Sequence, residues 1–395
     1  MDGGNFDKAV VDEAPWSART KAGVWALGAG AFALVGAEFL PMGLLTPIAH
    51  GLRVSEGLAG QTVTATAVTG AVAAIGAALV VGKADRKYVL FAFAALAVVS
   101  NILAALAPSI GWLLVARLFL GAAIGGFWSM AAAIAQRVAT PATVGRAMSI
   151  VFAGVSLATI CAPPVGAMVA ASLTWRAAFV AAAVVAVAVV LLQAVVLPAL
   201  APAGATRLGT VLGLLRQKGV RRGLVIVLLL AGGHFAAFTF IRAGLEAAKP
   251  SAAVLSGELL LFGAANFVGN LVFGRFVDRH VRGVVAVAGL MLGSAVGLSW
   301  LGGASVWTEA LAVAAWGFAF GGVPIGVQMW MAKAAPDRLE AVGGLMVAMF
   351  QVAIATGAAV GGAVFDRWGV AGPFGLAATA AVLAAVLAVV SGPEG

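Results

Sequence analysis

Long apolar stretches recur along the whole chain and are separated by short polar segments. Each is about 20 residues long or longer, the length that a helix needs to cross the hydrocarbon core of a bilayer. If these stretches are helices, apolar residues lie on every face of each helix, so no polar face is present to contact water. The pattern predicts an all-α polytopic membrane protein with twelve transmembrane helices, at roughly 22–48, 58–81, 88–107, 112–136, 146–170, 175–197, 223–245, 257–275, 283–302, 307–332, 341–364 and 371–391.

The composition agrees with this pattern and excludes several classes of protein. Of the 395 residues, 63% are hydrophobic and only 10% are charged, which is too little polar surface for a soluble protein of this size. The single cysteine, Cys161, excludes an internal disulfide, and three scattered histidines form no metal-ligand pattern. We therefore expect no metal and no cofactor. Because paired aspartates or a Ser/His arrangement within the spans are also missing, we do not expect an enzyme.

The basic residues set the expected orientation. The net charge is +9, but the charges are spread over short loops, which indicates membrane topology rather than nucleic-acid binding. Loops on the side of the N-terminus carry most of the lysines and arginines, and the opposite side has only Arg53, Arg176, Lys249 and Arg367, with Arg242 near its edge. We expect a bacterial inner-membrane protein with both termini in the cytoplasm. The first span contains Glu38 and Pro41 and is longer than a signal-peptide core, so we expect it to remain uncleaved.

A long loop divides the chain into two halves of six spans. The expected parts are a cytoplasmic tail (1–21), a six-helix bundle (22–197), a linker (198–222), a second bundle (223–391) and a short tail (392–395). The linker has apolar residues at helical spacing (Leu208, Val211, Leu212 and Leu215), which suits a helix on the inner membrane surface. A plain linker is the alternative.

The two halves resemble each other. Asp85-Arg86 recurs as Asp278-Arg279, Pro141 corresponds to Pro336, and Gly166 corresponds to Gly361. Such an internal repeat is typical of transporters, whose substrate site lies near the midplane between the halves. The two Asp-Arg segments at inner helix ends favour a cytoplasmic gate formed by Asp85, Arg86, Asp278 and Arg279. Their alternative role is to anchor the topology.

Two charged residues lie well inside spans. A carboxylate in hydrocarbon costs on the order of 2.5–3.5 kcal/mol, so the presence of Glu38 within a span indicates a functional or structural role. Removal from water favours its neutral form, which makes it a candidate proton carrier. Arg117 lies at a similar depth, and the two side chains are close enough along the membrane normal to pair. A static structural ion pair is the alternative to proton coupling.

Other polar residues within spans are candidates for the substrate cavity. Amide and indole groups suit a neutral, hydrogen-bonding, ring-shaped solute. For each amide or indole alone, the alternative is contact between helices. His234 is a candidate for binding the substrate or relaying protons, and its alternative is a hydrogen-bonded packing role. For Arg242 the alternative is extension of the side chain to the membrane interface. The candidates are Trp128, His234, Arg242, Asn266, Asn270, Gln328, Trp330 and Gln351.

Several motifs resemble the major facilitator superfamily, in its twelve-helix drug:proton antiporter branch. The loop motif appears as Gly274-Arg-Phe-Val-Asp278-Arg279, and a first copy reads Val81-Gly-Lys-Ala-Asp85-Arg86-Lys87. The fourth span carries Arg-x-x-x-Gly at 117–121, and the antiporter motif reads Ala162-Pro163-Pro164-Val165-Gly166. The resemblance implies two pseudo-symmetric six-helix bundles, a role for Arg117 in proton coupling, and an antiporter motif at Pro163, Pro164 and Gly166.

Within that branch, four stretches look like those of bacterial purine ribonucleoside efflux pumps. They are Glu38-Phe-Leu-Pro41-Met-Gly-Leu-Leu-Thr46-Pro47, the stretch from Ser55 to Gln61, Gly125-Gly126-Phe127-Trp128, and Phe238-Thr239-Phe-Ile-Arg242. The first three are also typical of arabinose-type sugar exporters. The likeness adds Gln61 and Thr239 to the cavity candidates. The chain departs from the pattern at Ala243, where a proline is usual, and at His234, where a glutamine is expected.

The expected function is proton-coupled efflux of a small polar solute by alternating access. Purine ribonucleosides are the first substrate that the resemblance implies, and arabinose-type sugars or amphipathic drugs are the alternatives. A passive facilitator or channel is the alternative from another class. The expected partners are the solute, protons and the lipid bilayer, with no nucleic acid, and the expected state is a monomer.

Overall fold

The computed structural model describes residues 16–80, 85–138, 144–197, 213–246, 251–301 and 306–393. Within these ranges the chain forms thirteen α-helices, one short 3₁₀ helix and no strand. The helices of the first half are α1 (Ala18–Leu52), α2 (Glu56–Val80), α3 (Arg86–Ala105), α4 (Ile110–Val138), α5 (Val144–Ser172) and α6 (Trp175–Val196). Those of the second half are α8 (Lys218–Phe238), α9 (Ile241–Glu246), α10 (Ala252–Gly274), α11 (Val281–Leu301), α12 (Val306–Ala334), α13 (Leu339–Trp368) and α14 (Ala371–Val390).

The predicted all-α membrane fold is confirmed. By length and composition, eleven helices in the described part of the chain are able to cross a membrane. The twelfth long helix, α2, has 25 residues and is long enough to cross as well. It carries Gln61 and four threonines, at 62, 64, 66 and 69.

The structure differs from the predicted spans near the start of the second half. The seventh span, expected at 223–245, begins five residues earlier at Lys218 and is interrupted at Thr239 and Phe240, where α8 ends and the short α9 begins. Residues 218–222 of the predicted linker therefore belong to a long helix. Residues 198–212 of the predicted linker lie outside the described residues, including Leu208, Val211 and Leu212 of the predicted surface helix.

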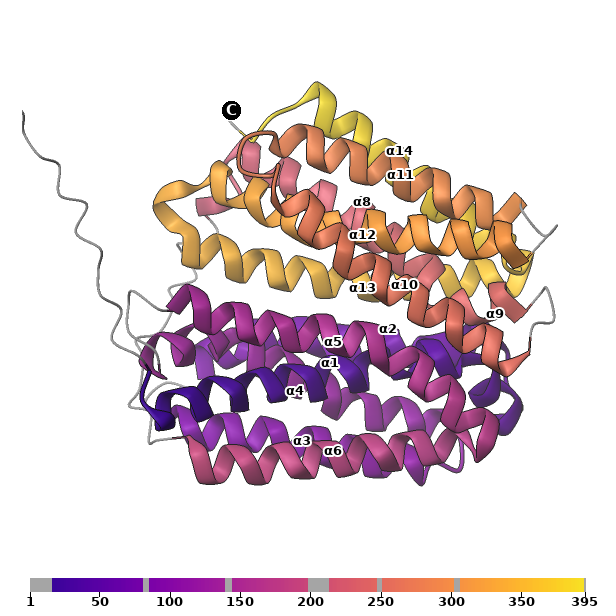
Figure 1. Cartoon of the computed structure of the whole chain (residues 1–395), viewed down its shortest axis with the longest axis horizontal. Helices are drawn as coiled ribbons and strands as arrows, with labels where there is room; N and C mark the ends of the chain where they lie inside the picture. The colour runs from indigo at the N-terminus through magenta and orange to yellow at the C-terminus, as the bar shows by residue number, and fades with distance from the viewer. Residues whose placement is uncertain are drawn as a thin grey trace, which may run out of the picture.

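Two bundles lie side by side, one formed by α1–α6 and the other by α8–α14 (Figure 1). Helices pair in the same way in both bundles. In the first bundle α1 packs on α5 and α6, α2 on α4, and α3 on α4 and α6. In the second bundle the corresponding contacts join α8 to α13 and α14, α10 to α12, and α11 to α12 and α14. The bundles meet where α13 packs on α2 and α10 packs on α5. This repeated pairing is the structural form of the internal repeat predicted from the sequence.

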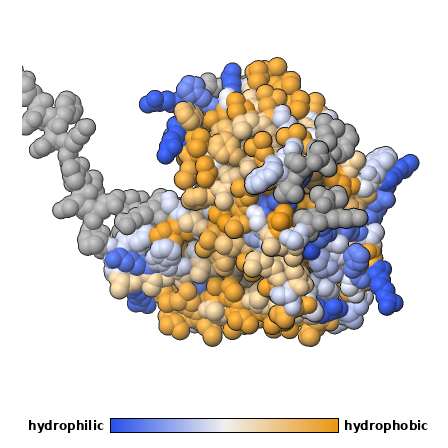
Figure 2. All heavy atoms as spheres, turned by 45° about the vertical axis from the view of Figure 1, so that its right-hand side comes forward, coloured by the Kyte–Doolittle hydropathy of each residue, from blue (hydrophilic) through white to orange (hydrophobic). Residues whose placement is uncertain are grey.

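Close approach of helix backbones holds each bundle together. A side chain at Gly125 of α4 would collide with the backbone of α2 at Gly70, and one at Gly321 of α12 would collide with the backbone of α10 at Asn266. Small residues allow such contacts in membranes, where apolar side chains gain little by leaving lipid for protein. The outer surface is broadly apolar over the sides of both bundles, and hydrophilic residues gather toward the ends (Figure 2).

Candidate functional site

Two prolines in α1 leave backbone carbonyl groups without their usual helical donors. Proline has no N–H, so it cannot donate to the carbonyl four residues before it. Pro41 therefore frees the carbonyl of Ala37, and Pro47 frees that of Gly43. A carbonyl without a donor in the membrane interior is costly unless another group supplies one. The two freed carbonyls are thus sites where α1 requires a donor from elsewhere.

Arg117 of α4 donates to the first of these carbonyls. Its Nη1 lies 3.0 Å from the Ala37 oxygen, its Nη2 lies 3.3 Å from the Glu38 backbone oxygen, and its Nε lies 3.0 Å from Thr66 Oγ1 on α2. The side chain is completely buried. Arg117 therefore joins α1, α2 and α4 one turn before Pro41 of α1.

Arg242 of α9 donates to the second carbonyl. Its Nη1 donates to the Gly43 oxygen, and its Nε lies 2.8 Å from Glu246 Oε1, with which it forms an ion pair. Only 8% of Arg242 is exposed, so protein encloses the side chain. Because Arg242 and Gly43 belong to different bundles, this bond crosses between the two halves of the protein.

Glu38 lies between the halves next to the Arg117 contact. Its carboxylate is buried, and Gln351 Nε2 of α13 lies 3.5 Å from its Oε1. The Arg117 hydrogen bonds go to the backbone of Ala37 and Glu38 and to Thr66, not to the Glu38 carboxylate. The ion pair considered from the sequence is thus not the contact formed in this state. The structure brings together Glu38, Arg117 and Gln351 from three helices.

His234 belongs to a column of stacked rings in the second bundle. Phe320, His234, Phe238 and Phe262 follow one another with centroid distances of 3.4, 4.9 and 4.6 Å and interplanar angles of 7°, 22° and 28°. Trp316 Nε1 donates to His234 Nδ1 at 3.0 Å. This bond assigns the proton of the neutral ring to Nε2, and Nε2 is buried with no partner among the described residues. The histidine is fully buried, which fits a packing role.

Trp128 and Phe152 form a second stacked pair, on α4 and α5. Their centroids lie 5.8 Å apart with an interplanar angle of 23°, and Phe127 meets Trp128 edge-on. Phe152 is 43% exposed. Trp128 is half-buried and packs on two apolar clusters, one within the first bundle and one that joins the bundles. Phe152 could not be predicted as a site residue, because the sequence of an apolar span does not show which of its apolar side chains point into the protein and which point to lipid.

The remaining cavity candidates are dispersed. Thr239 is buried and donates to the Phe235 carbonyl at 2.6 Å, and Gln61 Nε2 lies 3.4 Å from the Gly57 carbonyl within α2. Asn270 joins α10 to α12 through the Gly321 carbonyl at 3.3 Å, which is the helix-contact role considered as its alternative. Asn266 is half-buried, Gln328 is exposed, and Trp330 Nε1 donates to the Gly219 carbonyl at 3.1 Å.

Two of the predicted gate residues have described hydrogen bonds within their own bundle. Asp85 caps α3 by accepting from the Lys87 N–H at 2.8 Å, and the backbone carbonyl of Asp278 accepts from Lys333 Nζ. Arg279 is exposed, and the Arg86 side chain lies outside the described part of the structure.

The antiporter-motif residues of α5 pack against α1. A side chain at Gly43 would collide with the Pro163 carbonyl, and one at Gly166 would press on Leu40. Pro164 lies next to Pro163 inside α5. This motif therefore adjoins the α1 segment that Arg117 and Arg242 contact.

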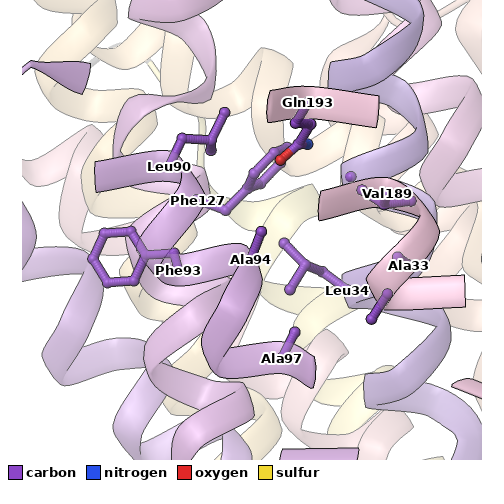
Figure 3. Close-up of a pocket in the computed structure, with 11 residues that line it drawn as sticks. Ala33, Leu34, Leu90, Phe93, Ala94, Ala97, Phe127, Val189 and Gln193 are labelled. Carbon is purple, nitrogen blue, oxygen red and sulfur yellow. The ribbon is translucent and has the colours of Figure 1, made fainter. Parts of the chain in front are cut away.

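A small cavity inside the first bundle does not suit a polar solute. It has room for about one water-sized sphere, ≈ 10 Å³, and its lining includes Leu90, Phe93, Phe127 and Val189 (Figure 3). Gln193 is the polar residue of the lining, and its Nε2 donates to the Ala26 carbonyl at 3.1 Å. Among the described residues, no group of three or more His, Cys, Asp or Glu side chains is placed to hold a metal ion.

Two matched helix bundles with charged side chains buried where they meet define a membrane transporter. The sequence comparisons agree: the chain belongs to the major facilitator superfamily, whose pattern it matches over residues 27–257 and 245–394. Proteins of this kind are transporters rather than enzymes.

Named relatives extend the likeness over nearly the whole chain. It is 35% identical over 356 residues to the purine ribonucleoside efflux pump NepI of Escherichia coli (strain K12), covering 90% of each chain. It is also 36% identical over 391 residues to the transcription regulatory protein OpdE of Pseudomonas aeruginosa, covering 97% of this chain and 96% of that one. The human organic anion transporter MFSD10 (TETRAN) has a similar fold, with a TM-score of 0.70 at 19% identity, covering 93% and 99% of the two chains.

Proposed function

We propose that this protein is a proton-coupled exporter of purine ribonucleosides in the bacterial inner membrane, with both termini in the cytoplasm. One observation carries the proton-coupling part: a buried carboxylate of one bundle, Glu38, contacts Gln351 of the other. A group that gains and loses a proton thus takes part in a contact between the halves. The NepI relatives, at 35% identity over 90% of the chain, support the substrate class.

Protonation of Glu38 changes the contact with Gln351. The ionised carboxylate accepts a charge-assisted hydrogen bond from the Gln351 amide, which is stronger than a bond to a neutral acceptor. Adding a proton removes the charge and weakens the hold of α1 on α13. A proton can drive a conformational change only by differing in affinity between the two states. The Glu38–Gln351 contact, which is stronger when Glu38 is ionised, gives the two conformational states different affinities for the proton.

Arg117 keeps the proton-carrying group in place. Its bonds to the backbone carbonyls of Ala37 and Glu38 hold α1 on either side of the Glu38 Cα atom. Its positive charge also favours the ionised form of Glu38. In this proposal Arg117 thereby favours release of the proton from Glu38 to the cytoplasm.

The Trp128–Phe152 pair is the proposed platform for the purine base. A base stacks on an aromatic ring with about 1–3 kcal/mol of free energy, and Phe152 offers an exposed ring. Gln351 and Glu38 supply hydrogen-bonding groups for ribose hydroxyls. Arabinose-type sugars lack a base and gain little from such a platform, whereas amphipathic drugs share the stacking but not the need for ribose contacts.

The test uses everted vesicles, in which the cytoplasmic face is outside. We expect labelled inosine to accumulate when the lumen is acidic, unlabelled guanosine to block its uptake, and arabinose to have no effect. Asp337→Asn is the matched control for Glu38→Gln, because Asp337 is an exposed carboxylate at the short 3₁₀ helix. Inosine uptake that is independent of the proton gradient would indicate a facilitator. Absence of inosine uptake by intact protein would remove the nucleoside assignment.

A further inference from the structure

Asp366 of α13 caps a helix that belongs to the other bundle. Its Oδ2 accepts from Ser55 Oγ at 2.9 Å, and its Oδ1 accepts from the Gly57 N–H at 3.0 Å. Ser55 Oγ in turn accepts from the Leu58 N–H at 3.1 Å. The first N–H groups of a helix have no partner within it, and the positive end of the helix dipole attracts a carboxylate. The N-terminus of α2 thus receives its anionic cap from 311 residues away in the sequence.

The position next to the cap is occupied by glycine for a steric reason. A Cβ atom at Gly57 would collide with the Asp366 carboxylate. A Cβ at Gly362, one turn before Asp366, would lie 2.7 Å from the Gly57 carbonyl. The two glycines let the start of α2 and the end of α13 approach closely enough for the cap to form.

Arg242 makes the second contact of this kind. It donates to the Gly43 carbonyl, which is free because Pro47 has no N–H, and Glu246 orients its guanidinium group at 2.8 Å. Gly43 lies in the last three turns of α1, and Ser55 follows α1 by three residues. Both contacts between the bundles therefore lie toward the same end of the molecule, the end at which α1 finishes and α2 begins.

We infer that Asp366 and Arg242 are positioning residues that form a two-point latch, which closes this end of the transporter. The inference rests on the proposed alternating-access function. Opening this end separates α2 from α13 and α1 from α9, so it breaks both points of the latch. The latch contains no part of the proposed substrate platform and acts through the backbones of α1 and α2. By the charge distribution of the loops, this is the outer end.

The latch favours the state that is closed at this end. Losing a helix cap or a charged bond to a carbonyl shifts a two-state ratio by about tenfold or more. Removing either point is expected to raise the population open at this end by that factor. Removing both is expected to raise it further, because the two contacts lie on different helix pairs and act independently.

Thiol labelling of a buried reporter tests the latch without knowledge of the substrate. Val63 of α2 is 1% exposed and belongs to the apolar cluster that joins the bundles. Val63→Cys in a Cys161→Ser background places one thiol there. An impermeant maleimide is then added to right-side-out and to everted vesicles. We expect Asp366→Ala and Arg242→Ala each to raise the labelling rate about tenfold, from the outer face only.

The controls separate the latch from general loosening. Arg367 is the exposed neighbour of Asp366 and stacks on Trp368 at 5.4 Å, so Arg367→Ala should leave the rate unchanged. Ser55→Ala removes one of the two Asp366 bonds, together with the Leu58 cap bond at the start of α2, and should give a smaller rise in protein that folds normally. Asp366→Glu should restore slow labelling in part. Unchanged labelling in the two alanine variants, or an equal rise in Arg367→Ala, would overturn the latch. These results hold whether or not inosine is the substrate.

Discussion

Each proline of α1 should be energetically coupled to one particular arginine. Pro41 frees the Ala37 carbonyl, and Arg117 Nη1 donates to it at 3.0 Å. Replacing the arginine with leucine leaves that carbonyl without a donor. Replacing the proline with alanine as well returns a backbone N–H to the same carbonyl. The loss caused by Arg117→Leu should therefore be smaller when position 41 is alanine.

The size of the effect follows from the number of bonds. Arg117 makes three hydrogen bonds, to Ala37, Glu38 and Thr66, and each is worth about 1 kcal/mol in a membrane protein. Arg117→Leu alone should cost about 3 kcal/mol on this basis. Only the bond to Ala37 is replaced in the double variant, so the coupling between Pro41→Ala and Arg117→Leu should be about 1 kcal/mol. The measurement is reversible unfolding in mixed micelles, analysed as a double-mutant cycle.

The second proline is the matched control. Pro47 lies six residues along α1, about 9 Å away, and frees the Gly43 carbonyl for Arg242. Pro47→Ala should couple to Arg242→Leu and be additive with Arg117→Leu. Additive behaviour of Pro41→Ala with Arg117→Leu, or equal coupling of both prolines to both arginines, would refute the assignment of one donor to each freed carbonyl.

Three further predictions concern the site. Glu38→Gln should abolish the response of inosine transport to a proton gradient. It should retain exchange of labelled for unlabelled inosine in counterflow, because exchange requires no net proton movement. Loss of both activities would assign Glu38 a structural role. Trp316→Phe should lower the melting temperature, since it leaves His234 Nδ1 without its 3.0 Å donor. Adding His234→Phe should recover most of the loss, because both partners are then apolar. No recovery would contradict the packing role of the histidine. Phe152→Ala should raise the KM for inosine about 5- to 150-fold, because it removes the exposed ring of the proposed platform and a stacking energy of about 1–3 kcal/mol. Trp25→Ala, at a 63% exposed indole, should leave the KM unchanged.

The fold was predictable because the bilayer imposes a length on every span. Eleven helices in the described residues meet the criterion of length and apolarity, and α2 is the twelfth long helix. The break at Thr239 and Phe240 was not predicted, since that stretch is as apolar as its neighbours. A helix that is apolar on all sides gives no periodic signal of where it bends.

The site was predictable only where a residue is costly in hydrocarbon. Glu38 and Arg117 stood out for that reason, and the structure places them side by side on α1 and α4. The Gly43 partner of Arg242 had a signal in Pro47, but the sequence does not say which donor reaches the freed carbonyl. Asp366 carried no signal, because a carboxylate at a helix end is ordinary. Its role depends on packing between residues that are far apart in the chain.

The sharpest test of proton coupling through Glu38 is proton movement driven by the substrate. Everted vesicles with an acidic lumen and a luminal pH dye receive unlabelled inosine from outside. We expect the luminal pH to rise as inosine enters and protons leave, equally in wild type and Asp337→Asn, and not to rise in Glu38→Gln. Inosine uptake with no change in luminal pH, or the same pH rise in Glu38→Gln as in wild type, would contradict this coupling.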